Sequence, residues 1–312
     1  MNEKKNWRFR VVCGAALMAF GLAGMTFVDT EVSTVEALIN AVSSSAAGST
    51  IRLAPGTYTD CKFFGCTASY NGGAGLYADY VSCLFETNSA PASGALWWPV
   101  VCKNCTFEGN RATSGAGGAV SMENTKTMTN CTFIANAALN GGALNLRPND
   151  KVLGWAFIRN TDTSNGGAIN GSRSNGATDA NGCRGSVIGN CTFVENVAGG
   201  LGGAVYDELN GVNLPMDVYG CAFTNNAADK GGATYSGRAR TSVFFGNHAN
   251  RGGAVFHKVA DHSNHWAVAC NFVSNYVTGA DVVDNRPASG GAIHDETLGT
   301  SWQAHPVRFT SC

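Results

Sequence analysis

The sequence predicts an all-β solenoid, a stack of short strands built from a short internal repeat. Eight Gly-Gly-Ala triplets alternate with eight Phe-x-x-Asn tetrads along the 312 residues. The tetrads recur mostly every 21 to 30 residues, which is too short a period for a four-stranded propeller blade. Forty glycines and only 14% charged residues indicate a chain rich in turns. In such a stack, each unit buries its apolar face against its neighbours.

The N-terminus has the pattern of an export signal, so residues 1–24 are predicted to be a signal peptide. A basic leader precedes the uncharged apolar run Val11–Ala23, and the small residues Gly21 and Ala23 supply a cleavage point. The alternative is an uncleaved anchor, because an apolar run extended to Val28 is barely long enough to cross a bilayer. The run is short and rich in glycine, which favours cleavage. The basic leader consists of Lys4, Lys5, Arg8 and Arg10.

Residues 25–58 are predicted to hold a capping helix and the first strand, and residues 59–312 the repeats. Ser33 to Glu36 has the form of a capping box, and Thr50–Leu53 alternates like a strand. We expect the helix to cover the open end of the solenoid, whose unpaired backbone groups otherwise invite aggregation. The alternative is a helix that serves only as a linker. Its apolar residues at helical spacing are Val35, Leu38, Ile39 and Val42.

The core is expected to consist of stacked columns. Alternate side chains of a strand face the same way, so the Phe of each tetrad and the residue two before it are predicted to point inward. The residue that follows each triplet is predicted to form a second inward column. The residue two before Phe is Trp155 or Ser242 in two repeats, and in the others it is cysteine: Cys61, Cys83, Cys105, Cys131, Cys191, Cys221 and Cys270.

The consensus residues at the bends are predicted to be structural. The Asn that closes each tetrad is expected to adopt the left-handed backbone region and to form an amide ladder with its neighbours. The double Gly is expected to relieve steric crowding at a second turn. No Lys-Ser/Thr and no helix follow the glycines, so they are not a phosphate loop. The same consensus explains the Asn-Cys-Thr triplets at Asn104, Asn130 and Asn190, which would be glycosylation sites only in a eukaryotic secretory route.

Twelve cysteines in an exported chain ordinarily predict disulfides. Here seven share one inward column, in which stacked Cβ atoms are about 4.8 Å apart, farther than the ~3.8 Å of a relaxed disulfide. We therefore predict free, buried thiols that pack as small hydrophobes. A straight column also cannot surround a metal ion tetrahedrally. Pairing stays open for four cysteines outside the column: Cys66, Cys102, Cys183 and Cys312.

The combination of GGA-[ILV] with F-x-x-N and a preceding Cys resembles the repeats of chlamydial polymorphic outer-membrane proteins. More widely, it is similar to the right-handed parallel β-helix proteins of the pectate-lyase-like group. The resemblance covers about residues 50–312, and it implies a right-handed parallel β-helix that is surface-displayed and often adhesive. Those outer-membrane proteins end in a membrane β-barrel, whereas Phe309–Cys312 begins another repeat. A secreted protein or a truncated gene product is therefore expected.

The residue two beyond each triplet's Ala is expected to face outward and to supply the binding site. Three insertions, Gly171–Arg184, Asp207–Pro215 and His257–His265, are expected to line up beside this stripe. Its rings would bind a glycan chain by stacking on the sugar rings, and the alternative is that they only stabilise the solenoid. After Ser121, Asn145 and Asn170, the stripe continues with the candidate binding residues Tyr206, Tyr235, Phe256 and His294.

Other chemistry is weakly indicated, and no catalytic residue, metal or cofactor is predicted. Glu86 and Glu108 occupy equivalent positions in adjacent coils, at a spacing that suits a retaining glycosidase. Later repeats place Ile134, Ile158 and Val194 there, which indicates a packing column. One loop holds a candidate metal cluster, for which scattered surface histidines are the simpler explanation: His257, Asp261, His262 and His265.

The formal charge of −1 gives no basic patch, so no nucleic-acid partner is expected. We predict a secreted or cell-surface interaction protein, adhesin-like or glycan-binding, whose partner is a polysaccharide or a cell-surface glycan. Contact with a membrane is expected only through the signal segment. The alternative is a polysaccharide-active lyase or glycoside hydrolase, although the chain has no Asp-Asp pair and no His followed by Gly.

Overall fold

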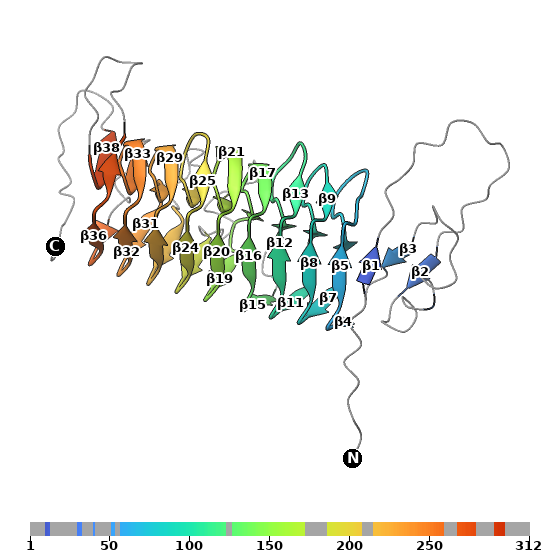
Figure 1. Ribbon diagram of the computed structural model, residues 1–312. Helices are drawn as coiled ribbons and strands as arrows, with labels where there is room; N and C mark the ends of the chain where they lie inside the picture. The colour runs from blue at the N-terminus through green and yellow to red at the C-terminus, as the bar shows by residue number, and fades with distance from the viewer. Residues whose placement is uncertain are drawn as a thin grey trace, which may run out of the picture.

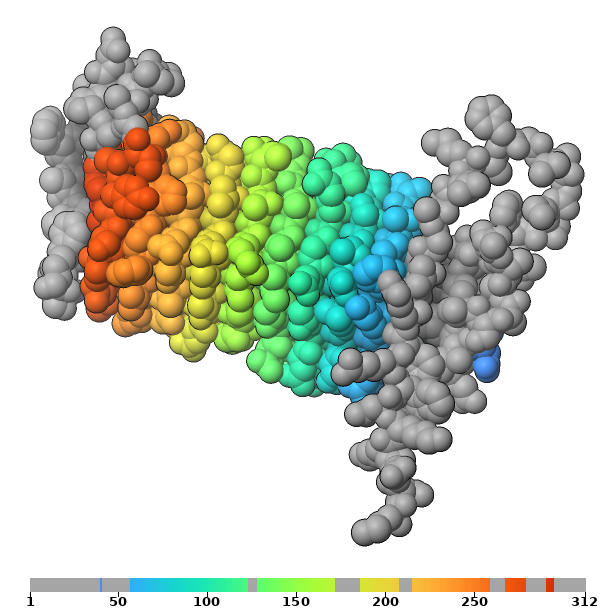
Figure 2. Space-filling view, viewed as in Figure 1, coloured from blue at the N-terminus to red at the C-terminus, as the bar shows by residue number. Residues whose placement is uncertain are grey.

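The chain coils into a long parallel β-solenoid (Figure 1). The computed structural model describes residues 10–12, 30–32, 40, 51–53, 57–122, 127–171, 186–207, 215–258, 267–278 and 290–296. Within these ranges every strand pair is parallel, and each strand pairs with its equivalents in the coils before and after it. The space-filling view shows the coils as successive bands packed against one another (Figure 2). The predicted all-β parallel solenoid is confirmed, while the right-handed sense of the coil stays a prediction.

One coil, residues 151–171, shows the course of the chain. It runs through β19 (Lys151–Leu153), β20 (Ala156–Ile158), β21 (Thr161–Asn165) and β22 (Ile169–Gly171). Each of these strands stacks into a different sheet. Sheet 1 contains β20 and the Phe column, and sheet 2 contains β21. Sheet 3 contains β22, and its strands follow the Gly-Gly-Ala triplets. Sheet 4 contains β19.

The remaining strands join these sheets in chain order. Sheet 1 also holds β1 (Arg10–Val12), β5 (Lys62–Phe64), β8 (Leu84–Glu86), β12 (Thr106–Glu108), β16 (Thr132–Ile134), β24 (Thr192–Val194), β28 (Ala222–Thr224), β32 (Val243–Phe245) and β36 (Asn271–Val273). Sheet 2 also holds β9 (Ser89–Ala90), β13 (Arg111–Ala112), β17 (Ala137–Asn140), β25 (Val197–Ala198), β29 (Ala227–Lys230), β33 (His248–Arg251) and β37 (Tyr276–Val277). Sheet 3 also holds β6 (Gly75–Leu76), β10 (Leu96–Trp97), β14 (Val120–Ser121), β18 (Leu144–Leu146), β26 (Val205–Asp207), β30 (Thr234–Tyr235), β34 (Val255–Lys258) and β38 (Ile293–Glu296). Sheet 4 has two parts, one with β4 (Thr57–Thr59), β7 (Asp79–Val81), β11 (Val101–Lys103) and β15 (Thr127–Thr129), and one with β19, β23 (Val187–Gly189), β27 (Asp217–Tyr219), β31 (Arg238–Arg240) and β35 (Ala267–Val268).

The phenylalanines of sheet 1 form a continuous internal column, as predicted. Neighbouring rings stack with centroids 4.7–5.0 Å apart and nearly parallel planes. The rings from Phe63 to Phe244 are fully buried, and each contributes about 1.5–3 kcal/mol through burial of apolar surface. The column consists of Phe63, Phe85, Phe107, Phe133, Phe157, Phe193, Phe223, Phe244 and Phe272.

The Asn of each tetrad forms the predicted amide ladder, but its predicted left-handed backbone is wrong. Asn136 donates from Nδ2 to Oδ1 of Asn160 at 3.0 Å, and its backbone N–H donates to the same oxygen. The positive φ falls one residue earlier, for example 54° at Arg159. The reason is that the sharp bend falls on an exposed residue, so the fully buried Asn can point inward at its neighbours.

The two glycines of each triplet have different roles. The first adopts a positive φ, for example 80° at Gly166, and Ser93 takes the same conformation at 55°. The second lets the coils approach each other: a Cβ on Gly167 would lie 2.0 Å from the carbonyl oxygen of Gly203 in the next coil. The prediction that this pair relieves steric crowding at a turn is confirmed.

The cysteine column is buried and its thiols are free, as predicted. Trp155 and Ser242 occupy the same column and are buried too. Cys102 also points into the core, with its Sγ atom 3.9 Å from Sγ of Cys131, and burial raises the pKa of the Cys102 thiol well above its ordinary value. Cys66 is disulfide-bonded to a partner outside the described residues. Cys183 and Cys312 also lie outside them.

The predictions for the N-terminus fall mostly outside the described residues. Within the predicted signal peptide only β1 is described, and it pairs with β5. Of the predicted capping helix only Asn40 is described, so signal and cap stay predictions. The expected strand before the first turn is confirmed as β3 (Ile51–Leu53), which pairs with β2 (Thr30–Val32). No helix in the described part of the chain has the length and apolar character needed to span a bilayer.

Candidate functional site

The outward column of sheet 3 begins with Leu76 and Trp97, is polar in the middle and carries four rings at its C-terminal end. The prediction from sequence began this column at Ser121 and so left out Trp97, which lies in register with Ser121 one coil earlier. In the middle, Asn170 donates from Nδ2 to Oδ1 of Asn145 at 2.9 Å. The full column consists of Leu76, Trp97, Ser121, Asn145, Asn170, Tyr206, Tyr235, Phe256 and His294.

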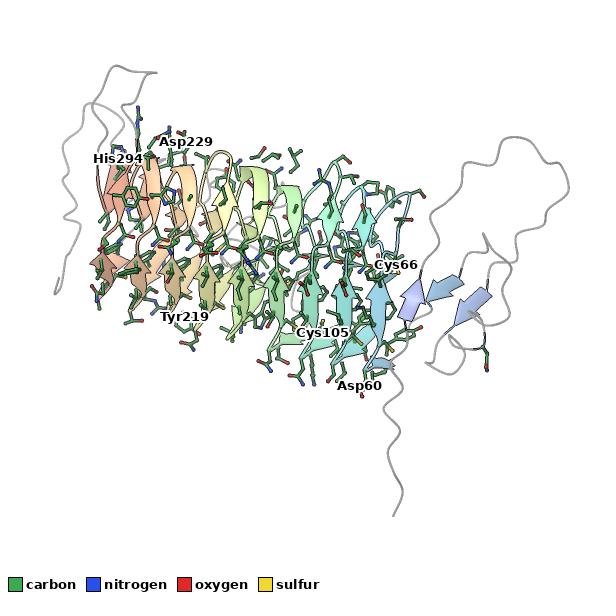
Figure 3. The ribbon with its side chains drawn as sticks, viewed as in Figure 1. Asp60, Cys66, Cys105, Tyr219, Asp229 and His294 are labelled. Atoms are coloured by element: carbon green, nitrogen blue, oxygen red, sulfur yellow. The ribbon has the colours of Figure 1, made fainter. Side chains whose placement is uncertain are left out.

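The four predicted binding residues lie together at the C-terminal end of this column, and we call them the ring ladder. Ring centroids are 5.5 Å apart for Tyr206 and Tyr235, and 5.2 Å apart for Tyr235 and Phe256. Phe256 and His294 follow at 4.8 Å. His294 is labelled in Figure 3 at the end of the solenoid opposite Cys66. The predicted stacking is therefore confirmed.

The ring ladder is not the open surface that was expected. Only 7% of Tyr235 and 0% of Phe256 is exposed, so no sugar can lie on the faces of these two rings. The Phe256 ring has Lys230 Nζ 5.3 Å from its centroid, and its Cβ packs beside Gly231 of the preceding coil. Tyr206 and His294 are half-buried. Binding by these two residues stays a prediction.

A second group of rings lies at the N-terminal end of the column. Trp97 and Trp98 stack with their centroids 4.2 Å apart and their planes at 22°. Tyr70 meets Trp97 edge-on at 6.3 Å, and Tyr77 meets both indoles at 5.9 Å. Tyr70 is 73% exposed and Tyr77 is 41% exposed. We call Tyr70, Tyr77, Trp97 and Trp98 the aromatic platform.

Two rings of the platform occupy strained backbone positions. Tyr77 has a φ of 46° and Trp98 a φ of 53°, and the equivalent position after β30 holds the much smaller Ser236 at 60°. A bulky side chain in this region is an outlier that costs on the order of 1–3 kcal/mol. Nε1 of Trp98 is also buried without an acceptor among the described residues, which adds about 1–3 kcal/mol. The backbone strain and the buried indole N–H therefore both lower the stability of the folded chain at these rings.

The sequence contained a pattern from which part of the platform could have been predicted. Trp97-Trp98 and Leu76-Tyr77 occupy equivalent positions in adjacent coils, because Trp97 pairs with Leu76. Following the sheet 3 column back to its first triplet would have placed Leu76 and Trp97 outward. The same alternation points Tyr77 and Trp98 the other way, so it does not anticipate their ring contacts with Trp97. Tyr70 carries no such signal, since it lies in the turn between β5 and β6.

The carboxylates Glu86 and Glu108 lie in register on the outer face of sheet 1, as predicted. Lys62 forms an ion pair with Glu86, which offsets the charge of that carboxylate. Ile134 and Ile158 continue the column as half-buried side chains. The arrangement matches the predicted packing column.

An unpredicted carboxyl group is buried in sheet 2. Asp162 lies between Ala138 and Ala198 in a column of small residues, and it is 7% exposed. Its Oδ2 accepts a hydrogen bond from the N–H of Gly141 at 3.1 Å, while its Oδ1 has no partner among the described residues. Burial raises the pKa of Asp162 from its ordinary 3.8 to about 7.

The candidate metal cluster lies mostly outside the described residues. His257 is described and is 1% exposed, whereas Asp261, His262 and His265 are not described. In the described ranges no group of three metal-ligating side chains converges. Likewise, most of the three predicted insertions lies outside these ranges, although the strands that flank them stack in register.

Comparison with known proteins identifies the repeats. The family model of the Chlamydia polymorphic membrane protein repeat matches residues 104–123 and 190–208. Each segment contains N-C-T-F-x-x-N followed by G-G-A-V, so each spans the Asn ladder and the glycine pair of one coil. No curated protein and no solved structure matches the chain.

Proposed function

Because the chain carries repeats of the Chlamydia polymorphic membrane protein type in a parallel β-solenoid, we propose that it is a surface-displayed, adhesin-like protein that binds glycans. One observation carries this proposal: the residues of the repeat consensus are buried inside the coils and so do not form the outer surface. The Phe rings, Asn amides and thiols are buried, whereas equivalent outward positions differ from coil to coil. A scaffold of this kind holds variable side chains on a rigid surface, which suits recognition.

The repeat family supports a location at the outer membrane or the cell surface. A glycan is the proposed ligand because accessible aromatic rings lie at the N-terminal end of sheet 3, where Tyr70 is 73% exposed and Tyr77 41% exposed. Aromatic rings offer flat apolar faces together with polar edges, which suits a ligand that has both hydroxyl groups and C–H faces. The formal charge of −1 gives the chain no basic excess with which to attract a strongly anionic partner.

The test is adhesion of the purified full chain, coupled to fluorescent beads, to cultured epithelial cells. We expect saturable binding that is lost when the cell-surface sugars are oxidised with periodate. Beads that carry heat-unfolded chain are the control for nonspecific attachment. Binding no stronger than that of the control would rule out an adhesin, and periodate-resistant binding would rule out a glycan ligand.

A further inference from the structure

We propose that the aromatic platform, Tyr70, Tyr77, Trp97 and Trp98, is a binding site for neutral pyranose rings. This inference rests on the proposed function for its ligand class, and it adds the location of the site in the first coils. The ring ladder at the other end of sheet 3, where the sequence predicted binding, has two of its four rings buried.

The platform combines a stacked pair of indoles with two tyrosines set at steep angles to them. The two indoles stack face to face at 22° with their centroids 4.2 Å apart, so each covers one face of the other and only the outer faces of the pair are left for a ligand. Tyr70 stands at 85° to Trp97, and Tyr77 stands at 61° to Trp97 and 69° to Trp98. The C–H face of a sugar would lie on the rings, and the phenol hydroxyls would remain available for its hydroxyl groups.

The backbone around the platform is held in place before any ligand binds. Asn71, next to Tyr70, bridges to Ala92 in the following coil, and the N–H of Gly72 donates to the Ala92 carbonyl at 3.2 Å. The N–H of Trp98 donates to the Ser121 carbonyl at 3.0 Å. The rings thus come from two adjacent coils that hydrogen bonds fix to each other, which lowers the entropic cost of binding.

The stretch of chain that carries the platform has no basic side chain with which to hold an anionic ligand. Residues 63–102 contain no Lys, Arg or His, and the acidic residues among them are Asp79 and Glu86. A nucleic acid or an anionic membrane surface would need basic side chains here. Ser69 and Asn71 flank Tyr70 in the chain and supply hydroxyl and amide groups. An uncharged ligand rich in hydroxyl groups therefore fits best.

Backbone strain separates this site from an ordinary patch of packed rings. Tyr77 and Trp98 hold positive φ angles, which glycine adopts without strain. A structural role would be better met by a smaller residue, as at Ser236. Strain that is kept at bulky side chains, one 41% exposed and one half-buried, points to binding rather than to folding.

The test measures binding of the full chain to immobilised neutral oligosaccharides, namely gluco-, galacto-, manno- and N-acetylglucosamine oligomers. We expect Trp97→Ala and Trp98→Gly each to weaken binding at least tenfold, while the thermal midpoint of Trp98→Gly stays close to that of the wild type. Tyr276→Ala is the matched control, because Tyr276 is 50% exposed and lies in sheet 2 at the other end of the solenoid. Its affinity should equal that of the wild type.

The possible failures are distinguishable. If the wild type binds an oligosaccharide and both tryptophan variants bind it equally well, the platform is not the site, although the proposed function stands. If binding falls only in step with the thermal midpoint, the rings are structural and the inference fails. If Trp98→Gly instead abolishes co-sedimentation with phosphatidylcholine vesicles, and no oligosaccharide binds, the platform contacts a membrane and the inference is overturned.

Discussion

The aromatic platform and the ring ladder lie at opposite ends of sheet 3, yet they are packed in opposite ways. In the ladder, Phe256 is fully buried and stacks between Tyr235 and His294 at 5.2 and 4.8 Å. In the platform, Tyr70 is 73% exposed and meets its neighbour edge-on. Trp97, the platform ring that shares the column with Phe256, is only half-buried, so equivalent positions in a repeat share a register without sharing an exposure.

The backbone shows the same contrast. Phe256 lies within β34, in an unstrained strand conformation, whereas Tyr77 and Trp98 come directly after their strands and carry a positive φ. Stacked rings within strands gain from burial and ring contact. Partly exposed rings at a strained corner raise the free energy of the folded backbone, and their burial offsets little of that cost. The difference teaches that the ladder contributes to stability and the platform to recognition.

The largest effect on stability is expected in the ring ladder. Phe256→Ala should lower the free energy of unfolding by about 3–5 kcal/mol, because it leaves a cavity between two stacked rings. Tyr276→Ala, at a 50% exposed ring, should cost less than about 1 kcal/mol. Urea denaturation measures both values. If both variants lost the same free energy of unfolding, the ladder would be no better packed than the surface, and the contrast between the two regions would be wrong.

The next largest effect concerns Asp162, in the coils between the two regions. Its folded-state pKa of about 7 lies above its ordinary 3.8, so the folded chain holds this proton more tightly. The resulting stability is fully present below about pH 4, and it is lost as the pH rises towards 7, by at most about 4 kcal/mol. Asp162→Ala, which continues the alanine column, should remove this dependence.

Urea midpoints between pH 4 and pH 8 measure the Asp162 effect, with Asp162→Asn as an uncharged control of similar size. Fluorescence of the tryptophans in the platform and near-ultraviolet dichroism of the tyrosines in the ladder would show whether both ends respond together. A wild-type midpoint as flat with pH as that of Asp162→Asn would contradict the burial of this carboxyl group. Different responses at the two ends would show that the halves of the solenoid unfold separately.

The smallest effect is expected at the platform. Trp98→Gly should change the free energy of unfolding by less than about 1 kcal/mol, because relief of the positive φ offsets the loss of a half-buried indole. Thermal unfolding followed by circular dichroism, side by side with Phe256→Ala, gives the comparison directly. A loss above about 2 kcal/mol would place Trp98 among the stabilising residues and remove the distinction between the two regions.

Sequence reasoning went furthest where one residue type repeats at one position. The Phe column, the buried thiols and the Asn ladder all follow from the alternation of side chains within a strand, so the spacing of the repeats is enough to derive their registers. It was less accurate at the bends. The positive φ belongs to residues such as Thr87 and Glu195, one place before the expected Asn, and no repeated residue type marks that place.

The sequence by itself determined which residues stack on which, because coils of similar length return each position to the same place. Only the tertiary structure decided which outward rings are covered and which stay accessible. Coverage depends on the neighbouring coil, as where Lys230 and Gly231 pack against Phe256, and on corner conformations such as the one at Trp98. These contacts join residues far apart in the chain, and no local pattern of side chains encodes them.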